Sequence, residues 1–400
     1  MSRHYLNRDS PWLLALLAAL VALGPLSVDM YIPAMPTMMA DLDTDVSHMH
    51  LTLSAYLVGF AVFHLACGPL ADRFGRKPVL YAGLALFVAG CLGCAVSSSI
   101  EQLLAFRLLQ GIGACVGPTL ARTITRDLFG PSKAARALSL IAMLMALAPA
   151  VAPTLGGLML LILPWSSIFF FLALYAGALA LVIHRLLPES LPQAQSLHPL
   201  AILRNYQELV SNPLFLSVTT AGGLVYAGLL AYISSSSFVY IDMLGVPVQY
   251  FGLIFLTAVA GYIVGSAVSA RLAHRLGSQQ LMLGGAILAL LAVGITLTAA
   301  LLWPPNVSAL MLPMILYSAG LGLVLPHAMA IALRPFPHIA GTASALMGFI
   351  QMSLSAAASA IAGAVLRDTP LPMLWLMLLI TLGAAVLALR AGRLDRRTTP

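Results

Sequence analysis

The chain has 400 residues, of which 60% are hydrophobic and 8% are charged, and its formal net charge is +7. Soluble domains carry roughly 25% charged residues, so this composition excludes a water-soluble protein and indicates an all-α integral membrane protein. The basic residues are scattered over many loops, one to three in each, which argues against a nucleic-acid-binding surface and for a role in membrane topology.

Twelve apolar stretches follow one another along the chain, and each is about long enough to cross a bilayer. We predict spans at residues 12–36, 48–70, 78–98, 101–124, 135–162, 165–187, 212–238, 249–272, 279–302, 307–333, 338–365 and 371–391. The odd-numbered loops between them contain almost no Lys or Arg, whereas the even-numbered loops and both ends are basic. By the positive-inside rule, both termini are expected in the cytoplasm.

Asp29, in the first span, is one of only two charged residues that lie clearly within the predicted spans. Pro25 and Pro33 stand four residues to either side of it, and each leaves a backbone carbonyl unpaired and bends the helix. A charge and polar backbone groups are tolerated at membrane depth where they face a cavity or a partner. We therefore expect Asp29 to face the interior of the protein.

A dense polar block separates the second span from the third. Its glycines and charged residues are Gly68, Asp72, Arg73, Gly75, Arg76 and Lys77. The two glycines allow a tight reversal of the chain, and the charges lie at a membrane surface. Charge pairs there could hold two helices in one arrangement and release them in another. A loop whose positive charge only sets the topology is the alternative interpretation.

Arg107, in the fourth span, is the second charge at membrane depth. At 1.5 Å per residue, Asp29 and Arg107 both lie roughly 10 Å inside the outer ends of their helices. We expect the two side chains to form a pair or to share one water-filled cavity, whereas the alternative is that Arg107 reaches the interface separately. Gly111 and Ala114 share a helix face with Arg107, so a neighbouring helix or a ligand can approach closely there.

The chain divides into two related halves. We predict an N-terminal six-helix bundle over residues 1–187, a cytoplasmic linker over 188–211 and a C-terminal six-helix bundle over 212–400. Residues 272–277 repeat residues 70–75 with an offset of 202, although His274 stands in the second copy where Asp72 stands in the first. A faint parallel repeat of this kind is typical of transporters built from two six-helix halves.

Two of these motifs resemble those of the major facilitator superfamily of transporters. The polar block is similar to the family's G-x-L-a-D-r-x-G-r-k signature, which implies that Gly68, Asp72, Arg73, Gly75 and Arg76 form a cytoplasmic latch. Arg107, followed by Gln110, Gly111 and Gly113, resembles the R-x-x-q-G motif of helix 4, whose arginine is linked to proton transfer. The resemblance implies twelve transmembrane helices in two pseudo-symmetric bundles and a functional monomer.

Two further stretches resemble the drug:proton antiporters of this superfamily. The sequence Asp29-Met30-Tyr31-Ile32-Pro33 is similar to their helix 1, where the aspartate serves in proton coupling and in the substrate site. The fifth span resembles their antiporter motif, which ends G-P-x-x-G-G; the positions that carry it are Pro149, Pro153, Gly156 and Gly157. Ala152 replaces the glycine that is usual before Pro153.

Within that group, the chain most resembles the Bcr/CflA drug-resistance exporters of the bacterial inner membrane. The similar stretches are 29–33, 122–127, 232–240 and 249–252. Ser237 stands where these exporters usually have proline, and Val21 stands where some relatives carry a second acid. The resemblance implies export of phenicol- or bicyclomycin-like compounds.

We therefore expect a multi-pass antiporter that exports small amphipathic drugs in exchange for protons, not an enzyme. Asp29 and Arg107 are the predicted proton-coupling residues, and Tyr31 and Tyr232 are expected to join them in binding substrate. The proton gradient is the expected energy source, since the sequence has no P-loop, and neither a cofactor nor a metal site is expected. An exporter or importer of an endogenous metabolite and a non-transporting membrane receptor are the alternatives.

His64 and His327 are two further candidates for proton transfer. Each lies within a predicted span, the second and the tenth. A histidine between packed helices serves more often as a hydrogen-bonded packing residue, which is the alternative at both positions.

Overall fold

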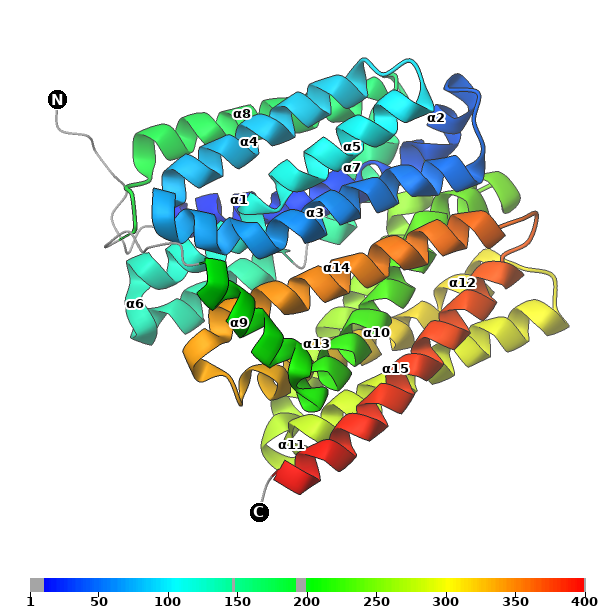
Figure 1. Cartoon of the computed structure of the whole chain (residues 1–400). Helices are drawn as coiled ribbons and strands as arrows, with labels where there is room; N and C mark the ends of the chain where they lie inside the picture. Colours follow the sequence, from blue (N-terminus) through cyan, green and yellow to red (C-terminus); the bar gives the residue numbers. More distant parts are fainter. Residues whose placement is uncertain (1–10, 146–147, 192–198, 399–400) are drawn as a thin grey trace. The chain divides into compact units, whose positions relative to one another are not determined.

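A computed structural model describes residues 11–145, 148–191 and 199–398 of the chain (Figure 1). Every element among these residues is a helix, and the described part of the chain contains no strand. The all-α prediction is therefore confirmed. By their contacts the residues form two compact units, Met1–Leu42 with Ala55–His198 (unit 1) and Asp43–Ser54 with Pro199–Pro400 (unit 2).

Unit 1 contains most of the first half of the chain. Its elements are α1 (Pro11–Asp29), a short 3₁₀ helix (Ile32–Ala34), α2 (Met35–Asp41), α3 (Val46–Phe74, which begins in unit 2), α4 (Arg76–Ala95), α5 (Ile100–Ala114), α6 (Val116–Met145), α7 (Ala148–Met159) and α8 (Ser166–Leu186). Helix α4 packs against α5 and α8, and α1 packs against α6.

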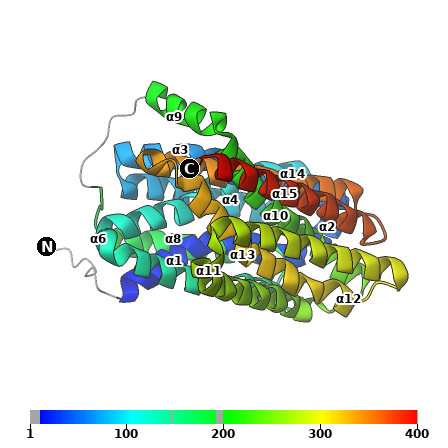
Figure 2. The same ribbon diagram turned by 90° about the horizontal axis from the view of Figure 1, so that it is seen from below.

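Unit 2 contains the second half together with the start of α3. Its other elements are α9 (Pro199–Ser211), α10 (Pro213–Ser237), a π-helix (Phe238–Met243), a 3₁₀ helix (Val248–Tyr250), α11 (Phe251–Leu302), α12 (Val307–Met311), α13 (Pro313–Leu333), a 3₁₀ helix (Pro337–Ile339), α14 (Ala340–Val365) and α15 (Leu371–Thr398). Helices α11 and α13 run side by side, as Figure 2 shows.

The helices account for the twelve predicted spans. Among the described residues, ten helical stretches are long and apolar enough to cross a membrane. The longest, Val248–Leu302, contains two predicted spans because the chain bends at Gly277. The fifth predicted span is divided between the end of α6 and the short apolar helix α7. One boundary was wrong, since α6 continues through the loop predicted before that span.

Prolines and glycines decide where the helices break. Helix α1 ends at Asp29, because Pro33 has no N–H to donate to the Asp29 carbonyl four residues earlier. Gly75 (φ 101°, ψ 153°) and Gly277 (φ 71°, ψ 160°) occupy a backbone region that favours glycine, and each joins two consecutive helices. The offset of 202 residues between them matches the sequence repeat. The predicted role of Gly68 in the reversal was wrong, since Gly68 lies inside α3.

The predicted linker is partly helical. Residues 199–211 form α9, which packs against α10 and α14 within unit 2, whereas residues 192–198 lie outside the described part of the chain. Residues Asp43–Ser54 pack with unit 2, although they precede and begin a helix of the first half. The predicted bundle boundaries follow the membrane spans and stay a prediction.

Candidate functional site

Arg107 lies in α5 with an exposed fraction of 0%. Its Nη1 donates to Gln110 Oε1 at 2.6 Å and to the Ser27 carbonyl of α1 at 3.2 Å. The guanidinium carbon lies 4.2 Å from the ring centroid of Tyr31 and 4.6 Å from that of Tyr56. A cation held over aromatic faces is stabilised by the ring quadrupole, and the effect is stronger away from water. Two tyrosines therefore take the place at which a carboxylate was expected.

Two nitrogens of this guanidinium have no acceptor. Nε and Nη2 of Arg107 are buried and make no hydrogen bond to any residue that the structure describes. A buried donor without a partner costs roughly 1–3 kcal/mol, and more when the group is charged. These two nitrogens form the side edge of the guanidinium, which can bind both oxygens of one planar group such as a carboxylate. The site is therefore able to accept another polar group.

Asp29 is the buried last residue of α1. None of the ion pairs among the described residues joins it to Arg107, so the predicted pair is not formed. The reason is the direction in which the two side chains leave the helix. Tyr31 follows Asp29 by two residues, so the two side chains leave the backbone on nearly opposite sides, and Tyr31 is the one that contacts Arg107. Similar depth in the membrane did not determine which way each side chain points.

Glycines bring the neighbouring helices close to this cluster. Gly111, one turn after Arg107, lies against the Tyr56 carbonyl of α3, and a Cβ at this position would collide with it. Gly156 of α7 lies against the Met30 carbonyl in the same way, next to Asp29. The predicted antiporter motif is therefore in direct contact with the segment that carries Asp29 and Tyr31.

The other motif positions in α7 are consistent with a bent, closely packed helix. Pro149 occupies the first turn, where a missing N–H is tolerated, whereas Pro153 lies inside the helix and removes one of its hydrogen bonds. Gly157 is buried like Gly156.

A charged cluster forms where α3 meets α4. Arg76 donates through Nη1 to Asp72 and through Nε to Asp127 of α6, the latter at 3.1 Å. The two oxygens of Glu189 accept the backbone N–H groups of Arg76 and Lys77, each at 3.0 Å. A carboxylate at the N-terminus of a helix satisfies free amides and complements the helix dipole.

The sequence analysis identified this cluster only in part. Arg73, which was grouped with Asp72, makes no ion pair within the described residues and lies over the ring of Phe74. Sequence reasoning missed Asp127 and Glu189 as partners. Asp127 ends a stretch that was quoted for its family resemblance, and Glu189 is the first acid after the sixth span, but neither position indicates a contact with Arg76.

The candidates in unit 2 are also engaged in hydrogen bonds. The hydroxyls of Tyr232 and Tyr240 lie 2.7 Å apart, and both rings are buried. Ser235 lies 3.2 Å from Nε2 of His50, whose ring stacks on Phe238 at the start of the π-helix. Such helical irregularities often occur at functional sites. The sequence analysis did not single out His50.

The two candidate proton carriers both have partners. Nε2 of His327 lies 2.8 Å from the Ser269 hydroxyl, and Nδ1 of His64 lies 3.6 Å from the Cys115 sulfur. These contacts agree with the interpretation of both histidines as packing residues.

Known proteins resemble this chain over most of its length. The sequence model of the Major Facilitator Superfamily matches residues 17–360. An uncharacterized MFS-type transporter, YdgK of Bacillus subtilis (strain 168), is 33% identical over 363 residues, which cover 90% of each chain. The bicyclomycin resistance protein homolog of Haemophilus influenzae (strain ATCC 51907 / DSM 11121 / KW20 / Rd) is 30% identical, with 92% of each chain covered. Multidrug resistance protein D of Escherichia coli (strain K12) is 32% identical, with 85% of each covered.

Solved structures show the same fold. The D-xylose-proton symporter superimposes with a TM-score of 0.73 at 14% identity, over 94% of this chain and 96% of the other. A bacterial homolog of the human lysosomal transporter Spinster gives a TM-score of 0.75 at 15% identity, over 96% of each chain. The predicted arrangement of twelve helices in two six-helix bundles is confirmed at the level of the fold.

Proposed function

Because the chain belongs to the major facilitator superfamily of membrane transporters, we propose that it exports small amphipathic drugs in exchange for protons. The observation that carries the proposal is the buried Arg107, whose two free donors lie among tyrosine rings in the unit that also holds the buried Asp29. Relatives named as bicyclomycin and multidrug resistance proteins support drugs as the substrate class.

The proposed coupling uses Asp29 as an acceptor for either the proton or the drug. An ionised carboxylate inside a membrane needs a partner beside it, whereas a protonated acid does not. In one state, Asp29 is ionised and accepts hydrogen bonds from the drug, whose own acceptor groups bind the free edge of Arg107. In the other, Asp29 carries a proton, which removes that acceptor and releases the drug. Binding of the proton and binding of the drug thus exclude each other, which is the requirement for antiport.

The proposed substrates are uncharged. With one acid and one base in this region, the site is close to neutral when Asp29 is ionised. A drug with nitro, amide or hydroxyl groups can accept hydrogen bonds from Arg107 and stack on Tyr31. A permanent cation has only Asp29 as a partner and must compete with Arg107 for it. We therefore propose a preference for phenicol-like compounds over quaternary ammonium dyes.

The movement that carries the drug across the membrane is proposed to follow the family's alternating access. The protein acts as a monomer with both termini in the cytoplasm, and the cluster around Arg76 stabilises one of the two end states. The two halves move against one another around a site near the membrane midplane.

Transport into inside-out membrane vesicles tests the proposal. Vesicles are energised with respiratory substrate and supplied with radiolabelled chloramphenicol or with a quaternary dye in parallel. We expect accumulation of chloramphenicol that a protonophore abolishes, with little accumulation of the dye. Strong dye transport without phenicol transport would contradict the substrate class, and accumulation that survives the protonophore would contradict proton coupling.

A further inference from the structure

One amide connects Arg107 to helix α4. Gln110 lies in α5, one turn after Arg107, and its exposed fraction is 0%. Its Oε1 accepts the hydrogen bond from Arg107 Nη1, and its Nε2 donates to the sulfur of Cys91 in α4 at 3.1 Å. Cys91 is buried as well and has no part in the proposed transport cycle. The three side chains thus form one hydrogen-bonded series that leads from α4 to the guanidinium.

The amide of Gln110 fits this series in only one orientation. Its two ends have nearly the same shape, but Oε1 accepts hydrogen bonds, whereas Nε2 only donates them. If the amide turned over, Nε2 would face Arg107 Nη1, and two donors would lie against each other. In the orientation that Arg107 needs, Nε2 requires an acceptor on its other side. The Cys91 sulfur is the acceptor that the described residues give it.

Close packing fixes the distance between Cys91 and Gln110. Cys91 follows Gly90, and a Cβ on Gly90 would lie 2.6 Å from the backbone nitrogen of Gln110. A Cβ on Gly113, one turn further along α5, would lie 2.3 Å from the backbone nitrogen of Phe87. The two glycines bring the backbones of α4 and α5 into contact beside this hydrogen bond, so the sulfur is held at a set distance from the amide.

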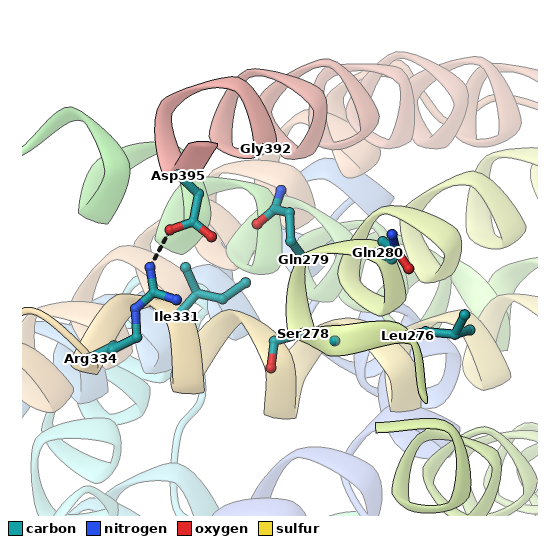
Figure 3. A pocket seen from close by; sticks show the side chains of 9 residues that line it. Leu276, Ser278, Gln279, Gln280, Ile331, Arg334, Gly392 and Asp395 are labelled. Carbon is teal, nitrogen blue, oxygen red and sulfur yellow. Dashed lines mark hydrogen bonds and ion pairs between the residues drawn. The ribbon is translucent and has the colours of Figure 1, made fainter. Parts of the chain in front are cut away.

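The internal repeat supplies a second copy of this helix pair. The offset of 202 residues takes α4 to the part of α11 that follows the bend at Gly277, where a cavity of about 330 Å³ lies (Figure 3). It takes Gly83, which lies against Gly113 in unit 1, to Gly285, which lies against Gly320 in unit 2. Gly320 of α13 is therefore the counterpart of Gly113.

The second copy carries neither the cation nor the sulfur. Counted from the matching glycines, the positions of Arg107, Gln110 and Cys91 are taken by Met314, Tyr317 and Val293. Valine has no acceptor, and the Tyr317 hydroxyl donates instead to the Val225 carbonyl of α10. The acceptor at the Cys91 position thus occurs in the copy that has the arginine, which agrees with a role of the sulfur in holding it.

We propose that Cys91 is a positioning residue for Arg107. Its sulfur holds the Gln110 amide, and the amide and the Ser27 carbonyl together hold Nη1. With Nη1 fixed at two points, the guanidinium does not rotate in its plane, and its Nε–Nη2 edge keeps one direction. Without the sulfur the amide is free to turn, and Nη1 keeps only the Ser27 carbonyl. The effect on drug transport rests on the proposed function, whereas the effect on the guanidinium does not.

Two substitutions of Cys91 differ mainly in the acceptor. Serine and alanine both remove the sulfur and are similar in size, but the serine hydroxyl can accept from Gln110 Nε2, whereas alanine leaves this donor unpaired. Cys94 supplies the control for a lost sulfur. It is buried in the same helix, and no described residue forms a hydrogen bond with its sulfur. Cys94→Ala therefore leaves a similar small space without changing the Gln110 amide.

NMR of the full-length protein in detergent tests the proposal without any drug. The arginine nitrogens are isotopically labelled, and the Nε–H signal of Arg107 is identified by its absence from Arg107→Lys. We expect this signal to shift and broaden in Cys91→Ala and to keep its position in Cys91→Ser and in Cys94→Ala. Gln110→Ala should displace the signal too, and adding Cys91→Ala to it should change nothing further. An unchanged signal in Cys91→Ala, or an equal shift in Cys91→Ser or Cys94→Ala, overturns the proposal.

Transport gives the second measurement. Because the free edge of Arg107 binds the drug in the proposed function, Cys91→Ala should raise the KM for chloramphenicol about two- to tenfold, the effect of one hydrogen bond, at an unchanged maximal rate. Cys91→Ser should restore the KM, and Cys94→Ala should not alter it. If the unmodified protein does not transport chloramphenicol, the proposed function fails, and the NMR signal alone decides the role of Cys91. If transport is normal in Cys91→Ala while Arg107→Lys loses it, the proposed function stands and the positioning role is wrong.

Discussion

Arg107 is a buried cation that is stabilised by ring faces and by a carbonyl oxygen. Its Nη1 hydrogen bonds and its two tyrosine contacts all depend on a planar group of fixed shape. The free edge formed by Nε and Nη2 depends on the same planarity. The site is therefore specific for arginine and does not merely require a positive charge.

Replacement of Arg107 by lysine tests this requirement. Lysine keeps the charge but cannot stack between two rings while donating to Ser27 and Gln110, so we expect drug transport to fall at least about tenfold, the effect of one lost charge-assisted hydrogen bond. The measurement is the initial rate of phenicol transport in vesicles, normalised to the amount of folded protein. Arg185→Lys, on an exposed position, is the matched control. A normal rate in Arg107→Lys would mean that the charge alone is sufficient.

At the scale of single residues, the sequence predicted which charged residues are buried in the spans and not how they meet. Asp29 and Arg107 were identified because charges at membrane depth are costly, and both are indeed buried. Their pairing was inferred from depth, which says nothing about the rotation of a side chain around its helix. Tyr56 was not among the expected substrate-binding residues, because an aromatic residue in an apolar span is most often a packing residue.

Helices in this protein approach one another most closely at particular glycines. Replacing Gly111 with alanine puts a methyl group against the Tyr56 carbonyl, so α3 and α5 must separate. Overpacking of this kind costs typically 1–3 kcal/mol. We expect Gly111→Ala to lower both the Tm in detergent and the transport rate.

Gly68 provides the contrasting substitution. It lies inside α3, and no atom lies within 4 Å of the position that a Cβ would take. Alanine favours a helix over glycine by roughly 0.5–1 kcal/mol, so Gly68→Ala should leave the Tm unchanged or raise it. If Gly68→Ala is the more harmful of the two substitutions, this glycine has a role in another conformation of the protein.

The charged cluster at the start of α4 leads to a prediction about the contacts between helices that Arg76 makes. Arg76 holds α3 and α6 together through Asp72 and Asp127, whose side chains are 40% and 18% exposed. The less exposed pair is less weakened by solvent, so Asp127→Asn should reduce transport more than Asp72→Asn, while both proteins still insert. Arg73→Gln should transport normally, since Arg73 makes no ion pair among the described residues. A defect in Arg73→Gln equal to that in Asp127→Asn would contradict this assignment.

Helices and bends were predicted well where a local sequence feature determines them. The apolar spans and the bend at Gly75 follow from composition and from glycine, and the bend at Gly277 follows from the repeat. Two features did not follow from the sequence. Helix α1 ends at Asp29, although the prolines of the first span were expected only to bend the helix. Helix α6 is continuous, although the polar residues before the fifth span resemble a loop. The contact of Glu189 with α4 joins positions more than 100 residues apart, which no local pattern indicates.

The two halves of the molecule carry different charged residues in the repeated segment. The first copy of the repeat contains Asp72, Arg76, Asp127 and Glu189 in one connected cluster. The second copy has His274 in place of Asp72 and borders an open cavity. We therefore expect a conformational latch of the proposed kind in the first half.

A substitution in the second copy tests this asymmetry. His274 is exposed, and none of the ion pairs among the described residues includes it. We expect His274→Asn to transport at a rate close to that of the unmodified protein, in contrast to Asp72→Asn. The comparison uses the same vesicle assay for both variants. A loss in His274→Asn as large as that in Asp72→Asn would show that both copies act as latches.

Exchange of a drug for protons is the central claim, and proton flux in proteoliposomes measures it most directly. The purified protein is reconstituted in known orientation around a pH-sensitive dye, and chloramphenicol is added on one side. We predict a proton movement opposite to that of the drug in the unmodified protein. In Asp29→Asn the proton movement should be absent, although the drug still binds. An undiminished, drug-dependent proton flux in Asp29→Asn would contradict the account, and it would assign the coupling to another residue, with His64 and His327 the next to be tested.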